Sequence, residues 1–297
     1  MRFDAQCIDC LVRRQRSLAD ERGEPEKSYQ FMRDVLQAIL DAPEGVAAPY
    51  LIPKFDEAFQ KYWPGTDPYA ELKRMSNDFM MARLPKLRAM VEASADPVRT
   101  ALQLAQVANY IDYGALSENV DTEKLDQMLF SAADNPVDEK TYTQFLTELE
   151  SARRMLYIGD NAGEIVADRL LLEALMQRFP HLSITYGVRG GPALNDVTRE
   201  DAAAVGLDQL VPIVDNGTRI SGTELGYIGQ EMRQVLEDAD VILAKGQANF
   251  ETLVTSGRNI YYIFLCKCVR FTRLFDVPML TGMFCRERDL HVETPFY

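Results

Sequence analysis

The spacing of apolar residues changes near Arg154, and this change limits the possible folds of the chain more than any other feature. Before Arg154, apolar residues recur every three or four positions, which is the period of a helix. The segments with this helical pattern are 8–19, 29–40, 70–84, 97–110 and 141–151. The sequence therefore predicts a helical N-terminal domain over residues 1–150.

After Arg154, short apolar runs that favour β-structure alternate with helical segments. The runs are MLYIGD, LSITYGV, QLVPIV, DVILAK and IYYIFL. Strands that alternate with helices pair in parallel, and helices then cover both faces of the sheet. We expect an α/β protein in which the helical N-terminal part packs on a Rossmann-like, mainly parallel α/β/α sheet over residues 151–297. No low-complexity linker separates the two parts, which is compatible with a shared core.

Charge and hydropathy exclude several classes of partner. The formal net charge of −13 gives an acidic surface, which repels nucleic acid and anionic membranes. No apolar segment approaches the roughly 20 residues of a membrane span, and the N-terminal MRFDAQCIDC has no apolar signal core. We expect a cytoplasmic protein that binds neither nucleic acid nor membrane. The sequence gives no oligomeric state.

The cysteines are expected to be reduced thiols. The chain has five, which is an odd number, and it lacks a signal peptide that would indicate an oxidising compartment. Cys7 and Cys10 form a CxxC pair, and Cys266 and Cys268 form a CxC pair. Four thiolates could bind zinc, but the CxC spacing is unusual. Binding of a second metal by these cysteines is left open.

Polar side chains follow the predicted strands at the points where the strands end. Open parallel sheets bind ligands at this edge, so these side chains are the candidate site. Asp160, Asn161 and Asp196 offer the hard oxygen atoms that Mg²⁺ and Mn²⁺ prefer. Lys245 or Lys267 could neutralise a phosphate. Read alone, the Asp-Asn-Ala-Gly sequence is more typical of a helix cap and turn than of a metal site.

Several of these segments resemble motifs of the damage-control phosphatase family, also known as domain of unknown function 89 or acidic-residue methyltransferase 1-like. They are DNAGE at 160–164, NDVT at 195–198, GTELG at 222–226 and KGQANFE at 245–251. The segments CIDC at 7–10 and NYIDYG at 109–114 are similar to the prokaryotic branch of that family. The resemblance spans most of the chain in order, and DNAGE and KGQANFE are its most specific parts.

This resemblance implies metal-dependent hydrolysis of phosphate esters by the domain of residues 151–297. Asp160, Asn161 and Asp196 would be the metal ligands and, through the metal, the catalytic residues. Mn²⁺, Mg²⁺, Ni²⁺ and Co²⁺ all accept oxygen ligands, so the identity of the metal is open. The partner would be a small phosphorylated metabolite, either a sugar phosphate or a damaged phosphometabolite.

The resemblance also implies which residues contact the substrate. They are Glu164, Gln247 and Asn249, with Lys267 on the phosphate and Lys245 as a second choice for that role. Eukaryotic relatives place the carboxylate of Glu164 one residue later. They also carry an arginine where this chain has Glu251, so their substrate contact cannot be transferred to that position.

Two mechanisms and two alternative functions remain at this point. A metal can activate water, whereas Asp160 could instead act as a nucleophile. Ala162 stands where the familiar nucleophile motif has its second aspartate, which favours metal-activated water. The alternative functions are an S-adenosylmethionine-dependent carboxyl methyltransferase and a non-catalytic metabolite-binding protein. Without a metal, Asp160 and Asp196 should repel each other, so we expect the loss of either to stabilise the metal-free protein.

Overall fold

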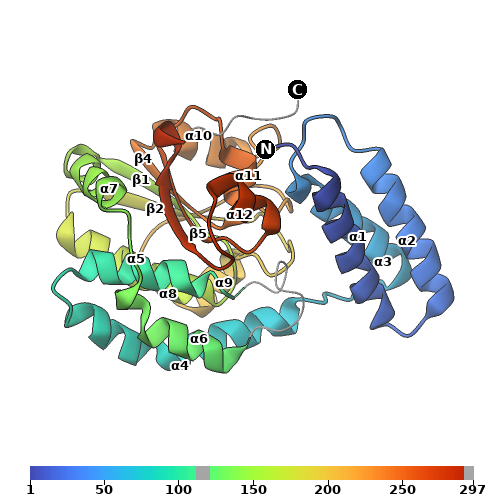
Figure 1. The fold of residues 1–297 in the computed structure, drawn as a ribbon, viewed down its shortest axis with the longest axis horizontal. Coiled ribbons are helices and arrows are strands. Elements are labelled where there is room, and N and C mark those ends of the chain that lie inside the picture. The colour runs from blue at the N-terminus through green and yellow to red at the C-terminus, as the bar shows by residue number, and fades with distance from the viewer. Residues whose placement is uncertain (112–120, 291–297) are drawn as a thin grey trace.

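A twisted sheet forms the centre of the protein (Figure 1). The computed structural model describes residues 1–111 and 121–290, and within them the sheet has the strand order β3-β2-β1-β4-β5-β6. The strands are β1 (Arg154–Ile158), β2 (Ser183–Val188), β3 (Ile213–Asp215), β4 (Val241–Lys245), β5 (Ile260–Leu265) and β6 (Gly282–Arg286). The first five pair in parallel, and β6 runs antiparallel to β5. The chain order reverses between β1 and β4, which is where such sheets bind ligands.

Helices pack on both faces of this sheet. The helices before the sheet are α1 (Ala5–Asp20), α2 (Pro25–Leu40), α3 (Ile52–Tyr62), α4 (Ala70–Glu92), α5 (Pro97–Ala108), α6 (Thr122–Phe130) and α7 (Glu139–Ser151). Those within it are α8 (Glu164–Arg178), α9 (Arg199–Ala204), α10 (Gln230–Asp238), α11 (Gln247–Leu253) and α12 (Val269–Phe275). Short 3-10 helices lie at Ala48–Leu51, Ala132–Asp134 and Glu287–Asp289.

Alternate residues of each strand enter two different cores. Tyr157 of β1 and Leu243 of β4 lie in the core shared with α4, α5, α7 and α8. Their neighbours Leu156 and Ile242 point to the opposite face, where α10, α11 and α12 cover them. This alternation follows from the two-residue period of a strand. The predicted α/β class, with helices on both faces of a mainly parallel sheet, is confirmed.

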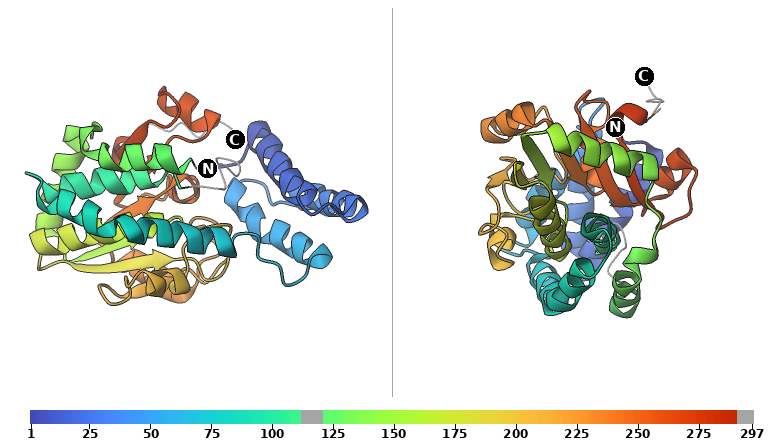
Figure 2. Two further views of the ribbon diagram at one scale, coloured as in Figure 1. Left: turned by 90° about the horizontal axis from the view of Figure 1, so that it is seen from below. Right: turned by 90° about the vertical axis from the view of Figure 1, so that its left-hand side faces the viewer.

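The helices of the first half belong to two different cores. Buried residues of α4 to α7 share one core with the sheet, and that core therefore crosses residue 150. In contrast, α1, α2 and α3 pack around their own aromatic cluster, in which Phe31 contacts the edges of Phe59 and Trp63. Figure 2 shows these three helices at one end of the molecule. The domain boundary predicted at residue 150 stays a prediction.

Several elements differ from the sequence-based expectation. The edge strand β6 was not predicted, because it is short and only its central residue, Phe284, is buried. The prediction ended the long helix at Leu84, before Pro85, yet α4 continues to Glu92. Leu87 and Val91 extend the buried face of α4 beyond the proline, and this packing outweighs the lost backbone hydrogen bond. Among the described residues, no helix combines the length and apolar character needed to span a membrane.

The start of α8 depends on a glycine that packs against α4. Gly163 has a φ of +82°, which side chains rarely adopt, and its amide donates a 2.6 Å hydrogen bond to Oδ1 of Asn77. A Cβ atom at Gly163 would lie 2.9 Å from the Cβ of Ser76. The turn between β1 and α8 is therefore fixed by both its backbone conformation and its contact with α4.

A pair of alanine substitutions separates these two effects. Gly65 also has a positive φ, of +72°, but a Cβ there would meet nothing within 4 Å. We expect Gly65→Ala to cost about 1–2 kcal/mol from backbone strain alone. Gly163→Ala should cost roughly 1–3 kcal/mol more, because it also overpacks the contact with α4. Urea denaturation measures both changes, and equal losses in the two variants would contradict the packing argument.

Candidate functional site

The loops that follow β1 and β2 are joined by backbone pairing. Asn161 forms an isolated antiparallel bridge with Asp196, and the amide of Val197 donates to the carbonyl of Asp160 at 2.8 Å. Both aspartates are buried, with 4% and 2% of their surface exposed. The structure thus brings together the predicted metal ligands Asp160, Asn161 and Asp196 at the carboxyl edge of the sheet.

The carboxylate of Asp160 is held by two amides and a glycine. Its Oδ2 accepts hydrogen bonds from the Nδ2 atoms of Asn161, at 2.9 Å, and Asn109, at 3.0 Å. Gly246 follows β4 with a φ of +86°, and a Cβ at this position would lie 1.9 Å from Oδ2 of Asp160. Only a glycine can therefore fit between β4 and this carboxylate.

Asp196 has a different environment, because a buried arginine neutralises it. The Nε of Arg189 donates to Oδ2 of Asp196 at 2.6 Å, and Ser221 Oγ lies 3.0 Å from both carboxylate oxygens. Replacement of Asp196 would leave the buried guanidinium of Arg189 without this partner. For Asp196 we therefore expect the opposite of the sequence-based prediction: its loss should destabilise the metal-free protein, because a buried cation loses this partner.

The other acidic residues of the site surround Lys245. The ammonium of this lysine is fully buried and lies 2.6 Å from Asp168 Oδ1 and 2.9 Å from Glu164 Oε2. The hydroxyls of Tyr157 and Tyr186 donate to Asp168 at 2.7 and 2.6 Å. Burial works to lower the pKa of Lys245, but Asp168 and Glu164 outweigh it and raise the pKa. This lysine therefore stays charged.

Glu164 lies where the two groups of carboxylates meet. Its Oε1 accepts hydrogen bonds from Asn161 at 2.7 Å and from Asn109 at 2.9 Å. Burial raises the pKa of its carboxyl to about 7, although the charges of Lys245 and Lys267 act in the opposite direction. Glu164 is therefore bound by neutral amide donors at Oε1 and by the Lys245 ammonium at Oε2.

The remaining predicted substrate residues lie on the same edge. Lys267 is 6% exposed, and its Nζ donates to the backbone carbonyl of Asn109 at 2.6 Å. Gln247 Oε1 accepts from the amide of Lys267 at 2.8 Å. The Nδ2 of Asn249 donates to the carbonyls of Gly159 and Lys245, at 3.0 and 2.6 Å. The structure therefore uses Asn249 and Lys245 to connect β1, β4 and α8, and their contact with substrate stays a prediction.

Asn109 is a site residue whose role the sequence did not predict. It caps the end of α5, far from DNAGE in the chain, yet its Nδ2 contacts both Asp160 and Glu164. Its Oδ1 also accepts the amide of Leu265, at the end of β5, at 3.0 Å. The only sequence signal was its position in the NYIDYG segment, of which residues 112–114 lie outside the described residues. Through Asn109, a helix of the first half reaches the candidate site.

The donor set is compatible with a hard divalent cation. Within residues 1–111 and 121–290, no three His, Cys, Asp or Glu side chains are grouped so as to hold a metal. The predicted set instead has two carboxylates and one carboxamide, and Mg²⁺ commonly takes one or two carboxylates together with water and phosphate. Because the Nδ2 of Asn161 donates to Asp160 and Glu164, a cation would be bound through its Oδ1.

The cysteines are free thiols, and burial makes most of them hard to ionise. Burial raises the pKa of Cys7 to about 11 and that of Cys266 to about 12. The Sγ of Cys7 accepts a 3.4 Å contact from Arg270. Binding of a second metal by Cys7, Cys10, Cys266 and Cys268 stays open.

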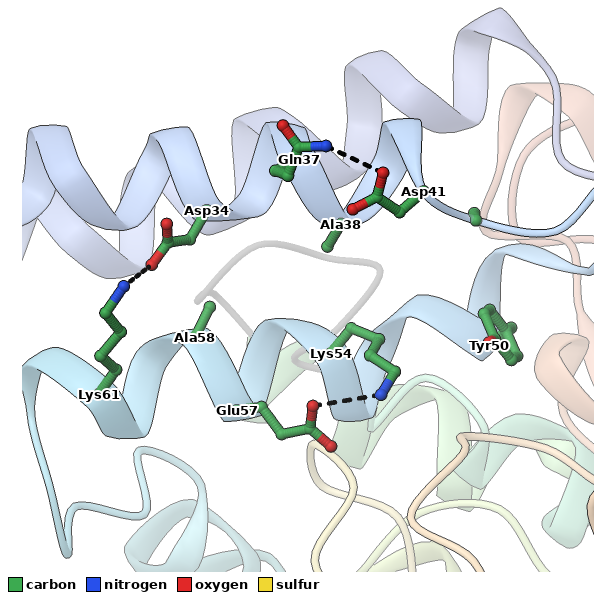
Figure 3. Close-up of a pocket in the computed structure, with 10 residues that line it drawn as sticks. Asp34, Gln37, Ala38, Asp41, Tyr50, Lys54, Glu57, Ala58 and Lys61 are labelled. Carbon is green, nitrogen blue, oxygen red and sulfur yellow. Dashed lines mark hydrogen bonds and ion pairs between the residues drawn. The ribbon is translucent and has the colours of Figure 1, made fainter.

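Two surface pockets lie away from the predicted residues. One, of 510 Å³, is a groove between α2 and α3, and its charged groups are paired, as in the 2.8 Å contact of Lys61 with Asp34 (Figure 3). The other, of 380 Å³, lies between the helices α1 and α3 and residues 192–194. None of the residues predicted to bind metal or substrate lines either pocket.

Comparison with known proteins gives consistent matches along the chain. A family model described as "Damage-control phosphatase ARMT1-like domain" matches residues 3–280. An uncharacterized protein of Methanocaldococcus jannaschii is 30% identical over 278 residues, which is 90% of each chain. A damage-control phosphatase of Archaeoglobus fulgidus is 34% identical over 218 residues, covering 73% of this chain and 74% of the relative. The crystal structure of a DUF89 family protein from Pyrococcus horikoshii superimposes with a TM-score of 0.83 at 25% identity, covering 97% and 99% of the two chains.

The first prediction for the site concerns Lys245. Lys245→Met would leave Glu164 and Asp168 buried without their cation, so we expect a loss of about 3–5 kcal/mol in unfolding free energy. The exposed Lys54, which pairs with Glu57 on the surface, is a matched control, and Lys54→Met should cost about 1 kcal/mol or less. Chemical denaturation compares the two. A similar small loss of unfolding free energy in both variants would show that Lys245 does not stabilise the fold through Glu164 and Asp168.

The second prediction concerns Asn109. Asn109→Asp keeps the shape of the side chain but adds a carboxylate beside Asp160 and Glu164. Like-charge repulsion raises the pKa of one carboxyl in the folded state, so stability is lost as the pH rises through that value. We expect the melting temperature of this variant, relative to the wild-type protein, to be lower at pH 8 than at pH 5. A decrease in melting temperature that is the same at pH 5 and pH 8 would contradict this placement of charge.

Proposed function

The chain belongs to the damage-control phosphatase ARMT1-like family, and we propose that it is a metal-dependent phosphatase of small phosphorylated metabolites. The names of its relatives support a phosphatase-type role. The finer features of the proposal are the metal, the residues that bind it and the substrate. They rest on the geometry of the site and on the family resemblance of its motifs.

One observation carries the proposal most directly. Two buried carboxylates from different strand ends, Asp160 and Asp196, are joined by backbone pairing at the point where the strand order reverses. The Nδ2 atoms of Asn109 and Asn161 both donate to Oδ2 of Asp160, and these hydrogen bonds fix the orientation of the carboxylate at the strand end. Such an arrangement of oxygen atoms suits a divalent cation.

Three residues would hold the cation and a fourth would meet the phosphate. Asp160, Asn161 and Asp196 are the proposed ligands, and a divalent ion there would polarise a phosphoryl oxygen and acidify bound water. Lys267, held by its contact with the Asn109 carbonyl, would neutralise charge on the phosphate. The direct attack of Asp160 on phosphorus remains the less favoured mechanism.

Gln247 supplies a further observation in favour of an oxygen-rich substrate. Its Oε1 is used by the amide of Lys267, which fixes the orientation of the carboxamide. Its Nε2 is buried and has no hydrogen-bond partner in the described part of the chain. A buried donor without a partner costs stability, and a hydroxyl or phosphate oxygen of the substrate would satisfy it. Glu164, on the same edge, is proposed to lie beside this substrate.

We propose a class of substrates and a group of metals. We include sugar phosphates and damaged phosphometabolites as substrates and Mn²⁺, Mg²⁺, Ni²⁺ and Co²⁺ as metals. A cytoplasmic location, expected from the sequence, is part of the same proposal. The test is phosphate release from a panel of phosphometabolites with each metal and with chelator, in parallel with a methyl-transfer assay using S-adenosylmethionine. Methyl transfer without phosphate release would support the alternative function.

A prediction for the two aspartates tests the proposed metal ligands. Asp160→Asn and Asp196→Asn keep the shape of the side chain and one oxygen atom but remove the negative charge. We expect each to weaken metal binding by at least about tenfold and to reduce phosphatase activity by about 100-fold or more. The exposed Asp208, away from the strand ends, serves as a control, and Asp208→Asn should behave as the wild-type protein.

Calorimetric titration with Mn²⁺ measures the affinity, and phosphate release measures turnover. Melting temperatures confirm that each variant is folded. Wild-type metal affinity and turnover in both Asn variants would end the metal-site proposal, whereas the same values in Asp208→Asn are expected.

A further inference from the structure

Arg189 is a buried arginine at the site to which the proposed function gives no role. It follows β2 directly, is 1% exposed and pairs through its amide with the carbonyl of Val197 at 2.9 Å. Its Nε donates to Asp196 at 2.6 Å, and its Nη2 lies 3.4 Å from the carbonyl of Gly159. One guanidinium therefore reaches both strand ends that carry the proposed metal ligands.

The buried guanidinium of Arg189 does not use all of its donors within the described residues. Its Nη1 is buried and has no hydrogen-bond partner within residues 1–111 and 121–290. Buried charged groups are costly unless they are paired and fully hydrogen-bonded. Other arginines of the described chain also have one buried donor without a partner, but Arg189 is the one that donates to a proposed metal ligand. The unused Nη1 donor therefore lies on a guanidinium that already contacts Asp196.

The charges of the site show what Arg189 contributes. Within residues 1–111 and 121–290, the buried charged side chains of the site are four carboxylates and three cations: Asp160, Glu164, Asp168 and Asp196, and Arg189, Lys245 and Lys267. A divalent cation would add two positive charges and so favour a phosphate ester. Loss of Arg189 would remove one positive charge from the metal-loaded site and weaken this attraction.

We propose that Arg189 is a positioning residue with two effects on the candidate site. First, its guanidinium holds the Asp196 carboxylate against the end of β1. Second, its positive charge limits the affinity of Asp196 for a cation, and it makes the metal-loaded site more attractive to a phosphate ester. The inference rests on the proposed function, because it concerns a cation held by Asp160 and Asp196. A residue that only stabilised the fold would affect neither cation affinity nor substrate affinity.

Two substitutions separate the charge of Arg189 from its geometry. Arg189→Met removes the charge and the donors, whereas Arg189→Lys keeps the charge but cannot reach Asp196 and Gly159 together. In Arg189→Met, Asp196 loses its buried partner, so we expect Mn²⁺ to bind on the order of tenfold more tightly and to raise the melting temperature more than it does in the wild-type protein. In Arg189→Lys, both quantities should stay close to those of the wild-type protein.

The effects on KM and kcat should also differ between the two variants. Loss of charge in Arg189→Met should raise KM for the phosphate ester by about tenfold and also lower kcat. Arg189→Lys should keep KM within about twofold and lower kcat by about tenfold, because Asp196 is no longer fixed. The metal response of the melting temperature is informative even for a poorly active variant, since it needs no turnover.

An exposed arginine provides the matched control. Arg199 pairs with Asp215 at 2.6 Å with nearly half of its side chain exposed, and Arg199→Met should leave cation affinity, KM and kcat unchanged. If Arg189→Met has the wild-type Mn²⁺ affinity and KM, the role of Arg189 is wrong even though the phosphatase proposal stands. If the wild-type protein neither binds Mn²⁺ nor releases phosphate, both proposals are wrong.

Discussion

The ion cluster around Lys245 is the interaction on which the rest of the structure depends. Lys245 ends the central strand β4, and its buried ammonium joins Glu164 and Asp168, which lie one turn apart on α8. Asp168 is bonded in addition to tyrosines of β1 and β2. Three neighbouring strands and one helix are thereby fixed relative to each other by direct contacts between buried side chains. Because α8 begins directly after DNAGE, this cluster also sets where the Asp160 carboxylate lies.

A buried site with this many carboxylates can fold only because each carboxylate has a partner that offsets its loss of contact with water. Lys245 serves Glu164 and Asp168, Arg189 serves Asp196, and carboxamides of Asn109 and Asn161 serve Asp160. Desolvation would otherwise force protonation of several of them. These partners allow Asp160 and Asp196 to stay buried at the carboxyl edge of the sheet.

The helical first half is part of the site as well as a cover for the sheet. Asn109 brings the end of α5 to Asp160 and Glu164, and its carbonyl holds Lys267. At the other end of the molecule, the helices α1–α3 contact the loop before Asp196, since Leu194 packs against their aromatic core and Arg219 pairs with Asp56 at 2.7 Å. The site is thus enclosed by residues from both halves of the chain.

The sequence alone determined the fold class and most of the site, because both depend on local patterns. The spacing of the apolar residues identified the helices and the parallel strands. Because the carboxyl ends of parallel strands share one edge of the sheet, the sequence also placed Asp160, Asp196, Gln247 and Lys267 together. It gave no role to Arg189, or to Asn109 beyond its position in the NYIDYG segment, because the chemistry of each depends on the side chains that it meets in the fold. It also could not show that Lys245 faces carboxylates. Lys245 and Asp168 are far apart in the sequence, and even Arg189 and Asp196 meet only because the loop between them folds back. Burial removes these charges from water, so each needs a partner, and only the tertiary structure decided which partner that is.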